Sequence, residues 1–133
     1  RGTFYKAELS GQMDKDQIKG KAKLQIDYED RCALMDSMIL CRFFRDFIQW
    51  DELKTLIEAT TGLIFDKDEL EILANRITQQ TRQYNIQEGL DASTDTLPPR
   101  FLKEATKEGA TLSAEDLATM INEYNDIRKG RDE

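Results

Sequence analysis

The most apolar stretch of this chain is CALMDSMILCRFFRDFIQW, residues 32–50. Within it Leu34, Met38 and Cys41 follow one another at spacings of four and three residues, and apolar residues upstream keep the same period, which is typical of an α-helix. Because the apolar residues form two stripes rather than one, we expect this helix to be buried on most of its sides. We therefore predict a helix over about residues 21–44, and we expect residues 32–50 to form the core.

The composition of the whole chain also favours helices. It has no valine, and only seven glycines and two prolines among 133 residues. Leu, Glu, Lys, Gln and Ala, which all favour helices, are well represented. We predict an all-α fold of about four helices in a single helical domain over residues 1–133, with residues 1–18 irregular.

Turn and capping signals predict three further helices. The first begins at Asp51 or the residue before it and is closed by Gly62. The second runs from Asp66 to about Asn85, and the third from Ser113 to Gly130. The residues that we expect to face inward are Leu53, Leu56 and Ile57, then Leu70, Leu73, Ala74, Ile77, Thr81 and Tyr84, and finally Leu117, Met120, Ile121 and Tyr124. Residues 89–100 contain both prolines and predict a long polar loop.

Charge and residue inventory argue against several functions. Twenty-six acidic residues against 19 basic ones leave a net charge of −7, so the basic surface that nucleic-acid binding requires is not expected. The absence of histidine excludes Ser-His and Cys-His catalysis and histidine-ligated zinc, and we predict no catalytic residue in this chain. No long apolar run or signal-peptide pattern occurs. Two cysteines are fewer than a secreted disulfide scaffold of this size would carry, so we expect reduced thiols in a cytoplasmic protein. Because the chain starts at Arg1 rather than Met, we expect a fragment of a larger protein.

Two residues of the apolar stretch could take part in chemistry. Asp36 is a carboxylate, and Cys41 is a thiol five residues further on. The simplest interpretation is that Cys41 is a small buried apolar group and that Asp36 pairs locally. The alternative is the edge of a cofactor site, with a thiolate for a soft metal and a carboxylate that accepts hydrogen bonds from a ligand. One cysteine cannot hold an iron–sulfur cluster, so about three further ligands would have to come from elsewhere.

Other charged and thiol residues favour structural roles. Residues 42–47, RFFRDF, are typical of a helix end that packs on the core, with the arginine stems lying along apolar surface. Residues 66–71, DKDELE, lack the glycine and the closing glutamate of an EF-hand and predict a helix start. Cys32 would lie roughly 13 Å from Cys41 along a helix, which is too far for a disulfide, so we expect both thiols to be reduced and Cys32 to be buried.

Four segments resemble the C-terminal helical region of the aldehyde ferredoxin oxidoreductase family, the tungsten-pterin enzymes of anaerobic archaea and bacteria. Residues 1–9, RGTFYKAEL, are similar to the family segment that follows a Cys-His-Leu sequence. Residues 36–43, DSMILCRF, resemble its D-x-x-G-L-C motif. EGL and DTLPPRF, at 88–90 and 95–101, resemble its R-E-G-F and D-x-L-P-x-R-F segments, and NEYNDIR at 122–128 resembles its closing L-D-E-Y-Y-x-x-R.

The resemblance implies roles for three residues. In the family the cysteine of D-x-x-G-L-C is the remote fourth ligand of a four-iron four-sulfur cluster, and the acid of the motif hydrogen-bonds one of two pterins that hold the tungsten. Carried over, Cys41 would be the cluster ligand, Asp36 the pterin contact and Leu40 a backbone contact. The motif's glycine is Ile39 here. In a continuous helix Asp36 and Cys41 would lie roughly 140° apart, so the helix must loosen before Cys41, which glycine would make easier.

The resemblance also implies an activity for a larger multidomain parent. The parent would oxidise an aldehyde to a carboxylic acid and pass the electrons through a tungsten or molybdenum bis-pterin and the cluster to ferredoxin. Expected partners are the remainder of the parent chain, ferredoxin and a small aldehyde, with a homodimer of the parent as one arrangement. The family's three-cysteine run and its catalytic residues are absent here, so we expect the fragment alone to be inactive and to bind no cofactor. The alternative is a stand-alone acidic helical module that binds proteins without a cofactor.

Overall fold

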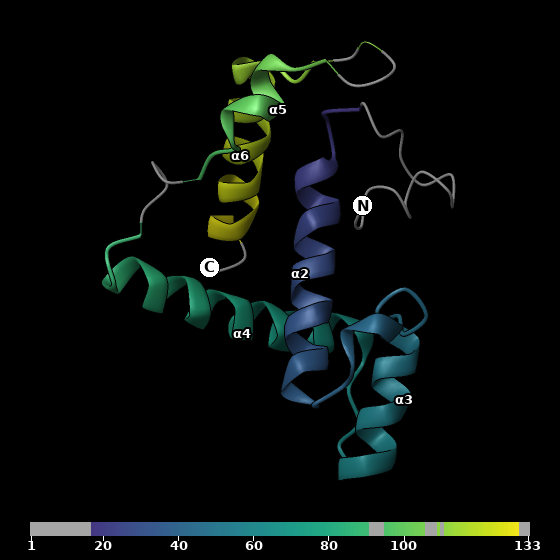
Figure 1. The fold of residues 1–133 in the computed structure, drawn as a ribbon. Coiled ribbons are helices and arrows are strands. Elements are labelled where there is room, and N and C mark those ends of the chain that lie inside the picture. The colour runs from purple at the N-terminus through teal and green to yellow at the C-terminus, as the bar shows by residue number, and fades with distance from the viewer. Residues whose placement is uncertain (1–16, 91–94, 106–108, 110, 131–133) are drawn as a thin grey trace. The chain divides into compact units, whose positions relative to one another are not determined.

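The computed structural model describes residues 17–90, 95–105, 109 and 111–130, and these form helices joined by turns and loops. The α-helices are α2 (Lys21–Ser37), α3 (Trp50–Thr61), α4 (Lys67–Gln87), α5 (Pro99–Lys103) and α6 (Ala114–Gly130), and a 3-10 turn, η1, covers Arg42–Phe44 (Figure 1). No strand occurs in the described ranges, and the all-α prediction is confirmed. None of these helices combines the length and the hydropathy needed to cross a lipid bilayer.

The chain divides into two compact units. One is the continuous stretch Ile26–Asn85, which holds the C-terminal part of α2, η1, α3 and most of α4. The other brings residues before Ile26 together with residues from Ile86 onward, including α5 and α6. All three predicted site residues lie in the unit Ile26–Asn85.

Helix α2 ends at Ser37, seven residues earlier than predicted. Ile39 takes a left-handed backbone conformation with φ of 59°. Its N–H donates to the carbonyl of Asp36 at 3.0 Å, and the N–H of Leu40 donates to the carbonyl of Met35 at 2.9 Å. This pair of bonds is a Schellman motif, which closes a helix. The predicted helix was too long for two reasons. The helical spacing of apolar residues continues past Ser37, and the left-handed residue that ends the helix is an isoleucine instead of the usual glycine.

The core of this unit is an apolar cluster in which α2, α3 and α4 meet. Its buried members are Leu34, Met35, Trp50, Leu53, Ile57, Leu70 and Ala74. Removal of these side chains from water supplies the main driving force for the packing of the three helices. The predicted inward residues Leu53, Ile57, Leu70 and Ala74 are therefore confirmed.

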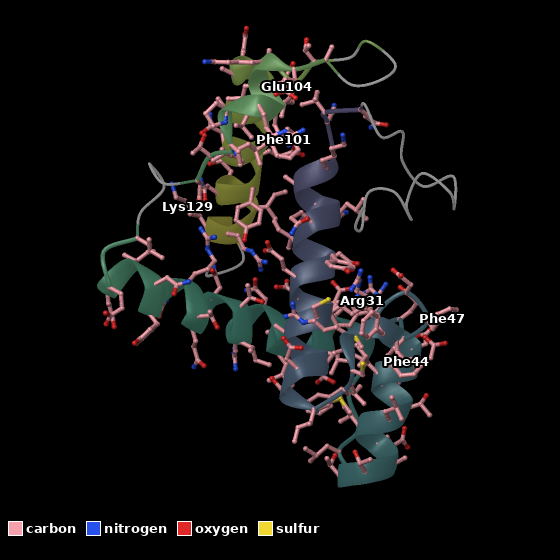
Figure 2. The ribbon with its side chains drawn as sticks, viewed as in Figure 1. Arg31, Phe44, Phe47, Phe101, Glu104 and Lys129 are labelled. Atoms are coloured by element: carbon pink, nitrogen blue, oxygen red, sulfur yellow. The ribbon has the colours of Figure 1, made fainter. Side chains whose placement is uncertain are left out.

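The second half of the predicted core, residues 39–47, lies largely at the surface. Ile39 is 93% exposed, Phe43 87%, Phe44 56% and Phe47 75%. Figure 2 shows Phe44 and Phe47 on the loop that joins α2 to α3. The prediction that residues 42–47 pack on the core as a helix end was wrong for the three phenylalanines. Once the chain leaves the helix at Ser37, helical spacing no longer decides which side chains face inward.

The remaining helix ends largely follow the predicted signals. Gly62 closes α3 with φ of 73°, and Gly89 follows α4 with φ of 93°. The Asp66–Glu69 capping box is present, with N–H to carboxylate distances of 2.8 and 2.9 Å, and confirms that residues 66–71 start a helix. The Ser113 hydroxyl accepts the N–H of Asp116 at 3.0 Å and caps α6.

Three predictions for the C-terminal half need correction or lie outside the described residues. Thr81 and Tyr84, expected to face inward on α4, are exposed. Pro99–Lys103 form the short helix α5, where a loop was predicted up to residue 100, because proline is well tolerated in the first turn of a helix. Residues 1–16, most of the segment predicted to be irregular, and residues 91–94 of the predicted loop are not among the described residues.

Candidate cofactor-binding site

The end of α2 and the loop after it carry all three predicted site residues. Asp36 lies in the last turn of α2 and is exposed, and Cys41 is also exposed. Cys41 has an extended backbone, with φ of −69° and ψ of 126°, and stands at the N-terminus of η1. Because a left-handed turn separates the two residues, the helical geometry that would point them about 140° apart does not apply. The loosening of the helix that a shared cofactor requires is therefore present, despite isoleucine in place of glycine.

Leu40 differs from its two neighbours because it packs inward. Its side chain is half-buried and lies against the apolar cluster. Its N–H already donates to the carbonyl of Met35. A backbone contact from Leu40 to a cofactor would therefore have to come from its carbonyl oxygen.

Asp36 is held by a two-point contact with Arg42. The Nε atom of Arg42 donates to Oδ1 of Asp36 at 2.9 Å, and its Nη2 atom donates to Oδ2. Bidentate pairing of this kind fixes the geometry of a carboxylate as well as its charge. The hydrogen bonds from Arg42 lower the pKa of Asp36 below its ordinary value, and the same contact raises the pKa of Arg42. Asp36 is thus ionised, and an acceptor only, at neutral pH.

The loop that carries Cys41 is anchored to α2 by Arg31. Its Nη1 atom donates to the carbonyl oxygens of Arg45 at 2.9 Å and of Ile48 at 3.1 Å. Arg31 is 7% exposed, and Figure 2 labels it beside this loop. Two backbone carbonyls of the loop are therefore satisfied by one buried guanidinium, which holds residues 45–48 in place relative to α2.

Two further contacts complete this anchor. The Nε atom of Arg31 lies 3.6 Å from a carboxylate oxygen of Asp27, whose other oxygen accepts the indole N–H of Trp50 at 2.7 Å. The guanidinium carbon atoms of Arg31 and Arg45 lie 5.8 and 5.9 Å from the centre of the Tyr28 ring. Sequence reasoning did not identify Arg31 as important. The available signal was an Asp27–Arg31 pair four residues apart on a helix expected to be buried on most sides.

The two cysteines have opposite environments. Cys32 is buried, as predicted, and burial raises the pKa of its thiol. Cys41 is exposed, so the interpretation of Cys41 as a small buried apolar group was wrong. The local pairing expected for Asp36 is present, as the contact with Arg42 shows.

The arrangement can contribute to a cofactor site but does not enclose one. Within the described parts of the chain no group of three or more Cys, Asp or Glu side chains could hold a metal ion. An exposed thiol on an extended residue fits the role of one remote cluster ligand, with the other ligands supplied from elsewhere. Two of about four acceptor positions on Asp36 are used by Arg42, which leaves the others for donors of a ligand.

These features define an acidic, all-helical unit that presents one thiol and one ionised carboxylate at the end of a helix. The family model described as "Aldehyde ferredoxin oxidoreductase, domains 2 & 3" matches residues 1–130, and the chain belongs to this family. The resemblance noted in the sequence is thereby confirmed.

Curated relatives agree with this assignment. Over 90 residues, or 67% of this chain, it is 38% identical to the tungsten-containing aldehyde ferredoxin oxidoreductase of Pyrococcus furiosus. The corresponding proteins of Thermococcus kodakarensis and Pyrococcus horikoshii are 34% identical over stretches of the same length. The matched segment spans 15% of the length of each of these relatives.

Proposed function

We propose that this chain is part of a tungsten-containing aldehyde ferredoxin oxidoreductase and forms one wall of its cofactor site. The parent would be a cytoplasmic enzyme that oxidises small aldehydes to carboxylic acids, with ferredoxin as the electron acceptor. When bound, the tungsten or molybdenum bis-pterin supplies the oxidation chemistry, and a four-iron four-sulfur cluster supplies single-electron transfer. The chain by itself would bind neither group and would be inactive, because the other ligands and the catalytic residues lie elsewhere in the parent.

The exposure of the Cys41 thiol carries this proposal. A cysteine without a chemical role is most often buried. Cys32 follows this tendency and is buried, whereas Cys41 is exposed. The Schellman turn at Ile39 directs the chain out of the helix two residues before Cys41. An ionised carboxylate, Asp36, stands at the same helix end.

Three residues would share the work in this site. Cys41 would give its thiolate to one iron of the cluster. Asp36 would accept hydrogen bonds from the N–H groups of a pterin, because its ionised carboxylate keeps acceptor positions beyond those used by Arg42. Leu40 would contribute its carbonyl oxygen, and its half-buried side chain would hold the segment against the core.

Several exposed apolar side chains lie close to Cys41 in the sequence. We propose that the remainder of the parent chain covers them. Ile39, Phe43, Phe44 and Phe47 are all exposed within nine residues of sequence, and we call this set the loop aromatic surface. Where exposed large apolar residues make a contiguous patch, the patch usually marks an interface, and the closeness of these four residues in sequence supports this interpretation. The loop aromatic surface flanks the proposed cluster ligand on both sides in the sequence, where the rest of the cluster site would have to approach.

Covalent labelling tests the partner for this surface. In the full-length parent, hydroxyl-radical labelling of Phe43 and Phe47 should fall several-fold relative to the urea-denatured protein. Equal labelling in the native and denatured states would contradict coverage by the remainder of the parent.

Paired cysteine variants of the full-length parent test the cluster ligand. In the 133-residue chain Cys41→Ala removes an exposed side chain and should change the free energy of unfolding by no more than about 0.5 kcal/mol, while Cys32→Ala removes a buried thiol and should cost about 1 kcal/mol. We expect iron content to fall in Cys41→Ala and to be unchanged in Cys32→Ala. Equal iron in both variants would end the assignment of Cys41. The alternative of a stand-alone interaction module also accommodates the loop aromatic surface, but it predicts no iron to lose.

A further inference from the structure

Asp36 and Arg42 form an exposed ion pair in the candidate site, and the proposed function gives a role to Asp36 but none to Arg42. It directly follows Cys41 in the sequence, and its side chain reaches back to both carboxylate oxygens of Asp36. It therefore joins the residue proposed to contact the pterin to the segment that carries the proposed cluster ligand.

The backbone of Arg42 is itself held in place. It is the first residue of η1, and its carbonyl accepts the N–H of Arg45 at 3.2 Å. The carbonyl of Arg45 in turn accepts Nη1 of the buried Arg31 at 2.9 Å. Hydrogen bonds thus link the buried side chain of Arg31 on α2 to the backbone of Arg42, whose side chain pairs with Asp36.

We propose that Arg42 is a positioning residue, which fixes the Asp36 carboxylate in the orientation that its pterin contact requires. The inference rests on the proposed function of Asp36. Without Arg42, Asp36 would be a half-exposed carboxylate in the last turn of a helix, free to change rotamer. Two donors on a planar guanidinium fix both oxygens at once, which the single ammonium of lysine cannot do. The oxygens' remaining acceptor positions then face a ligand with their direction already set.

The size of the effect follows from the cost of ordering one side chain on binding. That cost corresponds to about a two- to tenfold change in affinity. Among variants of one site such differences appear mainly in the dissociation rate. We therefore expect tungsten to leave the full-length Arg42→Gln protein about two to ten times faster than it leaves the unchanged protein.

The experiment measures tungsten and iron by elemental analysis during prolonged dialysis of the full-length holoenzyme. The variants are Arg42→Gln, Arg42→Lys, Asp36→Asn and the double variant, with Arg76→Gln as the control because Arg76 is an exposed arginine on α4. Arg42→Gln should lose tungsten faster, with iron content and melting temperature unchanged. Arg42→Lys should be intermediate, and Arg76→Gln should behave as the unchanged protein.

The double variant separates positioning from general destabilisation. If Arg42 acts through Asp36, Asp36→Asn combined with Arg42→Gln should lose tungsten no faster than Asp36→Asn alone. Additive effects would overturn the inference. Faster loss in Asp36→Asn with no change in Arg42→Gln would overturn the inference and leave the proposed role of Asp36 standing. No change in Asp36→Asn would overturn both.

Discussion

Replacing Ile39 with glycine should stabilise the unit Ile26–Asn85. A left-handed backbone costs a residue with a side chain about 1–2 kcal/mol, and glycine avoids that cost. Glycine has more freedom to lose on folding, which offsets about 0.5–1 kcal/mol of the gain. The isoleucine side chain is 93% exposed, so almost no packing is lost. The net expectation is a gain of about 0.5–1 kcal/mol.

Urea unfolding followed by tryptophan fluorescence measures this gain. Trp50 is the only tryptophan of the chain and lies buried in this unit, so its emission reports the unfolding of these helices. With a slope of about 1 kcal/mol per molar urea for a small unit, the midpoint should rise by about 0.5–1 M.

Ile39→Ala is the matched control for this variant. It removes the exposed side-chain atoms beyond Cβ but keeps Cβ, and with it the free-energy cost of the left-handed backbone. The urea midpoint should therefore move by less than half as much. A midpoint for Ile39→Gly at or below that of Ile39→Ala would refute the argument that backbone strain at Ile39 is relieved by glycine.

Three further predictions concern the anchor, the thiols and the pH dependence. Arg31→Met should lower the free energy of unfolding by about 2–4 kcal/mol, measured by the same fluorescence, because two loop carbonyls lose a charged donor. In the 133-residue chain iodoacetamide should alkylate the exposed Cys41 much faster than Cys32, because Cys32 is buried and its raised pKa lowers its thiolate fraction. Peptide mass spectrometry distinguishes the two alkylated cysteines. Equal rates at both would contradict the structure. Folding lowers the pKa of Asp36, so its pair with Arg42 should stabilise the fold at any pH above the ordinary Asp pKa of 3.8. This contribution should be lost as the pH falls through the lowered pKa. Both side chains are about half exposed, so Asp36→Asn should cost only a few tenths of a kcal/mol at neutral pH and nothing in strong acid.

Most of the secondary structure could be predicted because its signals are local. The Asp66–Glu69 capping box and Gly62 act on backbone within a few residues of themselves, and both work in the structure as the sequence indicates. The end of α2 could not be predicted in this way. Isoleucine is a poor signal for a left-handed residue, and the helical period of apolar residues runs on past it. Only the resemblance, with glycine in the motif at this position, pointed to a backbone break.

In the candidate site, too, local signals could be predicted and features that depend on the backbone turn or on distant residues could not. Asp36 and Cys41 stand out as polar groups in an apolar stretch, and the resemblance matches them to a motif of the family. The Asp27–Arg31 spacing marks Arg31 as a paired residue, but its role as the anchor of the loop could not be predicted, because that role depends on the carbonyls of residues 14 and 17 positions away. The exposure of Phe43, Phe44 and Phe47 follows from the backbone turn, and residue type alone predicts the opposite.

The two compact units differ in how the chain builds them. The unit with the candidate site is one unbroken stretch, Ile26–Asn85, whereas the other needs residues from both sides of that stretch. Bringing distant segments together carries a larger loop-closure cost than joining neighbours. During synthesis the ribosome therefore releases a complete set of core residues for Ile26–Asn85 before α6 exists. The segment with Asp36 and Cys41 can then fold first, and the second unit can form only after α6 has been made.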